Sequence, residues 1–120
     1  MHNHALAPQP HPDDLSRVCA VFTALSEPVR LRVVNLLSGG EQSVTQLVEA
    51  LELPQSTVSR HLALLRTTRL VTARREATRV YYRLTDAHLV SLTREAFSHA
   101  QHERLGLPDH PADLPSRARR

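Results

Sequence analysis

The 120-residue chain contains no lysine and no tryptophan, and it has a single cysteine, Cys19. One cysteine can form neither an internal disulfide bond nor a metal site built from cysteines alone. No apolar run approaches the roughly 18 residues that span a bilayer. The start, MHNHALAPQPHP, lacks the basic and apolar segments of a secretory signal. We therefore expect one small domain in a cytoplasmic protein.

The basic residues that are present are all arginine, and they are unevenly distributed. The chain has 15 of them and a net charge of only +3. Seven lie between positions 60 and 83, against a single acid, Glu76; they are Arg60, Arg66, Arg69, Arg74, Arg75, Arg79 and Arg83. Such a stripe is typical of a nucleic-acid-binding surface, although charge alone is also compatible with an ordinary solvated face.

The spacing of apolar residues, together with the residues that cap or end helices, divides the chain into five helices and a hairpin. We expect helices at about 13–25, from a Ser26 cap to Gly39, at about 45–51, from Pro54 to about 66, and at about 86–102. The segment LVTARREATRVYYRL, residues 70–84, has the β-forming ends and polar centre of a hairpin. Residues 1–12 and 106–120 are rich in Pro and expected to be a disordered arm and a flexible tail around a domain at 13–105. The fold class predicted is mainly α with a small β-hairpin.

The third and fourth helices, joined by a short turn, form a candidate helix-turn-helix. In the fourth, Val58, Leu62 and Leu65 form an apolar face. Its N-terminal half carries side chains that bond to bases or phosphates in the major groove. These are Gln55, Ser56, Thr57, Ser59, Arg60 and His61.

The arginine-rich hairpin follows directly after the fourth helix, the candidate DNA-recognition helix. Arg74, Arg75 and Arg79 lie near its tip, where they could contact a neighbouring backbone or minor groove. A polar half-helix also occurs on any exposed helix. The combination with the basic hairpin favours double-stranded DNA as a partner.

Four ligand-type residues are spaced along the last helix as D-x-H-x10-H-x2-H: Asp86, His88, His99 and His102. His88 and His99 share a face, but about 16 Å of helix axis separates them at 1.5 Å per residue. Metal–ligand bonds are only about 2 Å long, so one helix cannot bring both ends to one ion. Two copies packed antiparallel can, which predicts a homodimer with two symmetric sites. The alternative is a set of surface histidines.

The succession of SEPVRLRVVNLL, a short helix, LPQSTVSRHLALLRTTRLV and RREATRVYYRL resembles the ArsR/SmtB family of bacterial metal-responsive repressors, over roughly residues 13–105. The resemblance implies a dimeric winged helix-turn-helix that releases operator DNA when metal binds. Family members that sense zinc or cobalt and nickel carry the last-helix pattern, which this chain matches at all four positions. Ser43 and Thr45 stand where other members have a Cys-x-Cys site, and the hairpin tip lacks the family's usual glycine.

The metal expected at this site is Ni(II) or Co(II), with Zn(II) as the alternative. One carboxylate and three imidazoles suit all three ions, and four ligands alone would favour tetrahedral zinc. Extra ligands would favour nickel or cobalt, and Met1, His2, His4 and His110 could supply them. A His-rich terminus without any metal role is equally compatible with the sequence.

The sequence thus predicts a repressor and not an enzyme. A winged-helix repressor that answers a non-metal signal is the main alternative. A metal-dependent hydrolase is disfavoured, because no general base stands near an open metal position and there is no Gly-rich loop.

Overall fold

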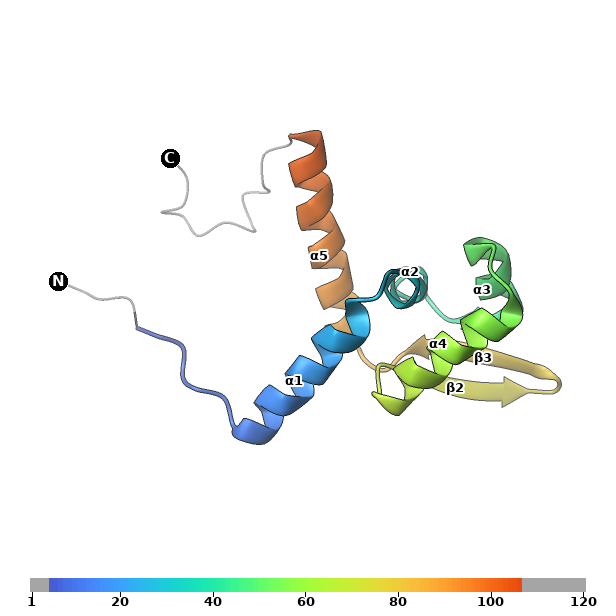
Figure 1. Ribbon diagram of the computed structural model, residues 1–120, viewed down its shortest axis with the longest axis horizontal. Helices are drawn as coiled ribbons and strands as arrows, with labels where there is room; N and C mark the ends of the chain where they lie inside the picture. Colours follow the sequence, from blue (N-terminus) through green and yellow to red (C-terminus); the bar gives the residue numbers. More distant parts are fainter. Residues whose placement is uncertain (1–4, 107–120) are drawn as a thin grey trace.

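The computed structural model describes residues 5–106, which form five helices and a three-stranded antiparallel sheet (Figure 1). The helices are α1 (Pro12–Leu25), α2 (Pro28–Leu37), α3 (Val44–Leu51), α4 (Gln55–Thr67) and α5 (Ala87–Leu105); the strands are β1 (Gln42–Ser43), β2 (Val71–Glu76) and β3 (Arg79–Leu84). This confirms the predicted fold class. None of these helices, within residues 5–106, is long and apolar enough to cross a membrane.

One apolar core holds the helix-turn-helix against the sheet. Its most deeply buried side chains come from α2, α3, α4 and the first residue of β2: Val33, Val34, Leu37, Leu47, Val58, Leu62, Leu65 and Val71. The predicted apolar face of α4 is confirmed, because all three of its residues are in this set. The core therefore fixes the orientation of α4 and leaves the opposite face of that helix in solvent.

Three local features differ from the sequence-based expectation. Glu27, not Ser26, caps α2: its Oε1 accepts the Arg30 N–H at 2.8 Å, whereas Ser26 ends α1. The strand β1 was not predicted, because two residues carry no periodic signal. The last helix runs to Leu105, three residues beyond the expected His102, and Gly106 then ends it in the left-handed region with φ 67°.

The hairpin β2–β3 is the wing of the fold, and its register assigns each side chain to a face. Arg74 pairs with Tyr81 and Arg75 pairs with Val80, so these neighbours point to opposite faces of the sheet. Strand β1 extends the sheet on the other side of β3, where Ser43 pairs with Tyr81. At the tip, Ala77 adopts φ 57° in the place where the resemblance implies a glycine.

The helices α1 and α5 project from the body on the side away from the wing tip (Figure 1). Residues 5–11 precede α1 without helix or strand and are exposed. His11 ends this segment by accepting the Asp13 N–H on its Nδ1 at 3.0 Å. The other residues of the expected arm and tail, 1–4 and 107–120, lie outside the described residues.

Candidate nucleic-acid interface and metal ligands

The exposed face of α4 carries most of the predicted base-reading side chains. The helix begins after Pro54, whose carbonyl accepts the N–H groups of Thr57 and Val58. Gln55, Ser56, Ser59 and Arg60 are exposed, and Thr57 is half-buried. A helix anchored by its apolar face and exposing short polar side chains in its N-terminal half can enter a major groove.

His61 lies on a different side of α4 from these residues. Its side chain is 14% exposed, and its Nδ1 lies 3.7 Å from Oε1 of Glu27 and 3.4 Å from Nη1 of Arg30. Arg30 in turn donates from Nε to the Ala24 carbonyl at 2.7 Å. The imidazole therefore joins α4 to the corner between α1 and α2. In the structure the His61 imidazole is thus directed toward Glu27 and Arg30.

The two adjacent arginines of the wing differ in their partners. Arg74 donates from Nε and Nη2 to the carboxylate of Glu41 at 2.9 and 2.8 Å, and from Nη1 to Glu76 at 2.6 Å. Its guanidinium also lies 4.6 Å from the centre of the Tyr81 ring. These hydrogen bonds raise the pKa of Arg74 and lower the pKa of Glu41. Two carboxylates thus compensate the charge of Arg74.

Arg75 and Arg79 are exposed, and no ion pair or hydrogen bond holds either guanidinium within residues 5–106. A cavity of about 150 Å³ lies where the wing tip approaches the start of α4; Gln55, Thr78 and Arg79 line it, together with Thr45 from α3. The fold thus brings the start of α4 and the tip of the wing to one surface. Neither Thr45 nor Thr78 was predicted as a DNA contact, because an isolated threonine carries no motif for one.

Two of the four predicted metal ligands lie at the start of α5 and two lie in its second half. Asp86 caps the helix by accepting the Leu89 N–H on Oδ1 at 3.1 Å, and the same oxygen lies 3.6 Å from Nδ1 of His88. Near the other end, Nε2 of His99 lies 3.6 Å from Oε1 of Glu103, and His102 is half-buried. The first pair and the second pair are thus separated by most of the helix.

Within residues 5–106 of one chain, no three His, Cys, Asp or Glu side chains gather closely enough to hold a metal ion. The donors themselves fit the metals expected, since imidazole nitrogen and carboxylate oxygen suit Zn(II), Co(II) and Ni(II). The side chain of His88 is 98% exposed, so a second molecule can reach it. The four suggested extra ligands, Met1, His2, His4 and His110, lie outside the described residues.

Apolar side chains are exposed on both projecting helices. On α1, Leu15, Val18 and Phe22 are each about half exposed, at 53%, 48% and 55%. On α5, Phe97 is 39% exposed. Residues 15, 18 and 22 follow the spacing of one helical face, so α1 offers a continuous apolar stripe to a partner.

Comparison with known proteins gives consistent matches. Residues 27–73 match the family model described as "Bacterial regulatory protein, arsR family". The chain is 40% identical over 104 residues to the HTH-type transcriptional regulator KmtR of Mycobacterium tuberculosis, a match that covers 86% of this chain and 80% of that protein. It is 39% identical over 98 residues to the regulator NmtR of the same organism, covering 81% and 82%.

A solved structure extends the likeness to the fold. The homodimeric winged helix-turn-helix DNA-binding domain of Mb0332 from Mycobacterium bovis, described as a possible ArsR-family transcriptional regulator, matches with a TM-score of 0.73. The match has 31% sequence identity and covers 88% of this chain and 99% of that one.

Proposed function

Because the chain belongs to the ArsR family of bacterial regulatory proteins, which are DNA-binding transcription regulators and not enzymes, we propose that it is a metal-responsive repressor. Its apo homodimer binds operator DNA. Binding of Ni(II) or Co(II), or alternatively Zn(II), at the α5 dimer interface releases the DNA.

The observation that carries the metal-sensing part is the distribution of donors along α5. Asp86 and His88 lie at its beginning, and His99 and His102 lie near its end. In an antiparallel pair of α5 helices, the beginning of one helix lies beside the end of the other, so each site draws two ligands from each protomer. The bound ion supplies a link between the two α5 helices.

The DNA-binding part rests on α4 and the wing. The side chains available to bases are Gln55, Ser56, Thr57, Ser59 and Arg60, with Arg75 and Arg79 directed to the phosphate backbone. Arg74 instead orients the wing through Glu41. Because each protomer supplies one α4, the operator has two half-sites whose spacing must match the separation of the two helices.

Release follows from the shared use of α5 by the dimer interface and the metal. A metal that draws the two α5 helices into one arrangement also fixes the separation of the two α4 helices. If that separation differs from the spacing of the half-sites, the metal-bound dimer binds DNA more weakly than the apo dimer. Linkage then requires DNA to weaken metal binding by the same factor by which metal weakens DNA binding.

The test is a fluorescence-anisotropy titration of the full chain with duplex DNA taken from upstream of its own coding region, in the absence and presence of Zn(II), Co(II) and Ni(II). We expect tight binding without metal and an increase of at least tenfold in Kd with the cognate metal. If the chain binds the DNA tightly and no metal changes the Kd, the protein is a repressor that responds to a non-metal signal. Absence of DNA binding would refute the operator function.

A further inference from the structure

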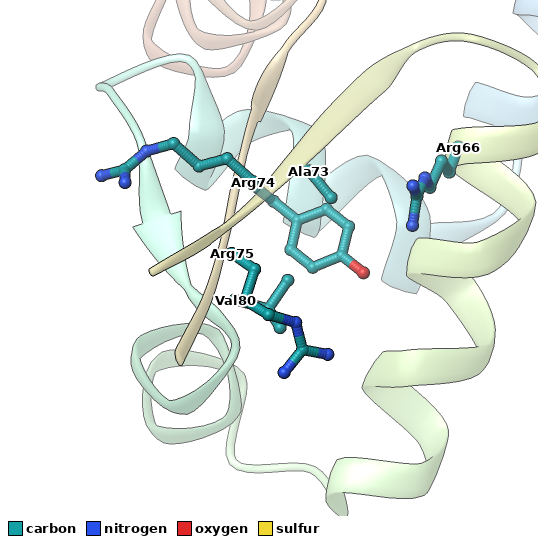
Figure 2. A pocket seen from close by; sticks show the side chains of 6 residues that line it. Arg66, Ala73, Arg74, Arg75 and Val80 are labelled. Atoms are coloured by element: carbon teal, nitrogen blue, oxygen red, sulfur yellow. The ribbon is translucent and has the colours of Figure 1, made fainter. Parts of the chain in front are cut away.

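A cleft of about 340 Å³ lies between α4 and the inner face of the wing. Arg66 lines it from α4, and Ala73, Arg74, Arg75, Val80 and Tyr82 line it from the two wing strands. Figure 2 shows Arg66 on the helix and Arg75 on the strand across from it, while the guanidinium of Arg74 extends in the opposite direction, away from both. The cleft thus has a cationic side chain on each side.

The charges of this cleft are uncompensated. Arg66 and Arg75 are exposed, and within residues 5–106 neither guanidinium has an ion pair or a hydrogen bond. No acidic residue lines the cleft. The side chain of Arg74 lies on the other face of the same strand and differs in its partners, because Glu41 and Glu76 both bind its guanidinium. A desolvated anion in the cleft would therefore meet two available cations and no repelling carboxylate.

Apolar side chains also contribute to the lining of the cleft. Ala73, Val80 and Tyr82 line the cleft together with the arginines, and a tyrosine hydroxyl can donate a hydrogen bond. A sugar–phosphate backbone has the matching chemistry, since its deoxyribose faces are apolar and its phosphates are anionic. Arginine is suited to bidentate phosphate contact.

We propose that this cleft seats the phosphate backbone of one DNA strand, with Arg66 and Arg75 as its cationic partners from α4 and β2. The inference rests on the proposed DNA-binding function and adds Arg66, which lies beyond the base-reading half of α4. When α4 occupies the major groove and the wing tip reaches the adjacent minor groove, the strand that divides the two grooves must cross between helix and wing. The cleft occupies that place.

The experiment measures how Kd depends on salt concentration for a labelled 30-base-pair duplex of mixed sequence and, in parallel, for the upstream duplex. Each neutralised phosphate contributes about 0.9 to the slope of log Kd against log salt concentration. Arg66→Gln and Arg75→Gln each remove one contact per protomer and two per dimer. Each variant should reduce the slope by about 2, and the double variant by about 4. Arg17→Gln on α1 removes the same charge away from the cleft and should leave the slope within experimental error of wild type.

The outcomes separate this inference from the function on which it rests. If the wild-type chain binds the duplexes but Arg66→Gln and Arg75→Gln keep its slope, the cleft does not seat the backbone, although the chain binds DNA. If Arg17→Gln lowers the slope as much as the cleft variants, net charge explains the effect and the cleft assignment is wrong. Absence of wild-type DNA binding would instead overturn the proposed function. Circular dichroism of each variant checks that the fold is retained, as expected because both cleft arginines are exposed.

Discussion

Arg74 in β2 and Glu41 before β1 are joined by two hydrogen bonds, of 2.9 Å from Nε to Oε2 and 2.8 Å from Nη2 to Oε1. The two residues are 33 positions apart in the chain. This paired geometry fixes the plane of the guanidinium as well as its position. It ties the wing to the segment between α2 and α3, so the direction of the wing is set from outside the hairpin.

The first prediction concerns the pH dependence of this pair. The hydrogen bonds from Arg74 hold the pKa of Glu41 below its ordinary value of 4.5. A carboxyl whose pKa is lower in the folded state stabilises the fold above its unfolded pKa, and that contribution is lost as pH falls through the folded pKa. Glu41→Gln should therefore have a lower Tm than wild type near neutral pH, and the difference should shrink below about pH 4.5.

The control for this measurement is Glu49→Gln. Glu49 is exposed on α3 and has no ion pair within residues 5–106. Its substitution should leave Tm close to that of wild type at every pH. A Tm difference for Glu41→Gln that persists unchanged into acid would show that the ion pair with Arg74 does not cause it.

The second prediction separates His61 from the exposed face of α4. His61→Ala removes a largely buried imidazole that contacts Glu27 and Arg30, and should lower the free energy of unfolding by about 1–2 kcal/mol. Ser59→Ala removes an exposed hydroxyl and should change stability by less than about 0.5 kcal/mol. For operator affinity we expect the reverse: when both proteins are fully folded, Ser59→Ala should lose more affinity than His61→Ala. Chemical denaturation and anisotropy measure the two quantities.

The third prediction tests whether each metal site spans two chains. His88→Ala and His99→Ala should each bind DNA but fail to release it with metal. In a heterodimer of the two variants, one site loses both histidines and the other keeps its complete ligand set. Mixing the variants should therefore restore about half of the metal binding of wild type in the heterodimer fraction, measured by calorimetry. A mixture no better than the separate variants would contradict the antiparallel arrangement.

The fourth prediction concerns the exposed apolar stripe of α1. Phe22→Glu places a charge in the stripe and should shift the protein from dimer to monomer in sedimentation velocity, with loss of operator binding. Leu6→Glu is the matched control: Leu6 is 92% exposed and lies before α1, outside the stripe. If Phe22→Glu remained dimeric with wild-type affinity, the dimer interface would not include this face of α1.

The elements of the fold could be predicted from sequence where the signal is local. The apolar spacing of Val58, Leu62 and Leu65 determines which face of α4 is buried, and all three side chains are at most 1% exposed. Helix ends were less predictable, because a cap depends on one side chain reaching one N–H group. Ser26 and Glu27 are adjacent and both able to cap, yet only Glu27 accepts from the first turn of α2.

The sequence predicts the candidate site as a set of residues, but it does not predict the contacts that these residues make. Alternation along a strand implies that Arg74 and Arg75 point to opposite faces, but not which face contains Glu41. His61 is of a residue type that often contacts DNA. Its position on α4, however, places it beside Arg30, which lies on another helix. Arg66 was visible as part of the basic stripe, but its relation to Arg75 depends on how α4 packs against β2. The contacts of Arg74 with Glu41 and of His61 with Arg30 join residues more than 30 positions apart in the chain.

Strand β2 lies at an edge of the sheet, since the strand order is β1-β3-β2. Its outward N–H and C=O groups have no strand beside them within residues 5–106, and such an edge can pair with the same edge of another molecule and begin aggregation. The second half of β2 is Arg74, Arg75 and Glu76, three consecutive charges in a strand of six residues. A second β2 aligned in parallel and in register on this edge would place each of these charges opposite its own copy. The charges that make the wing a candidate DNA contact thus also disfavour this pairing at the exposed strand.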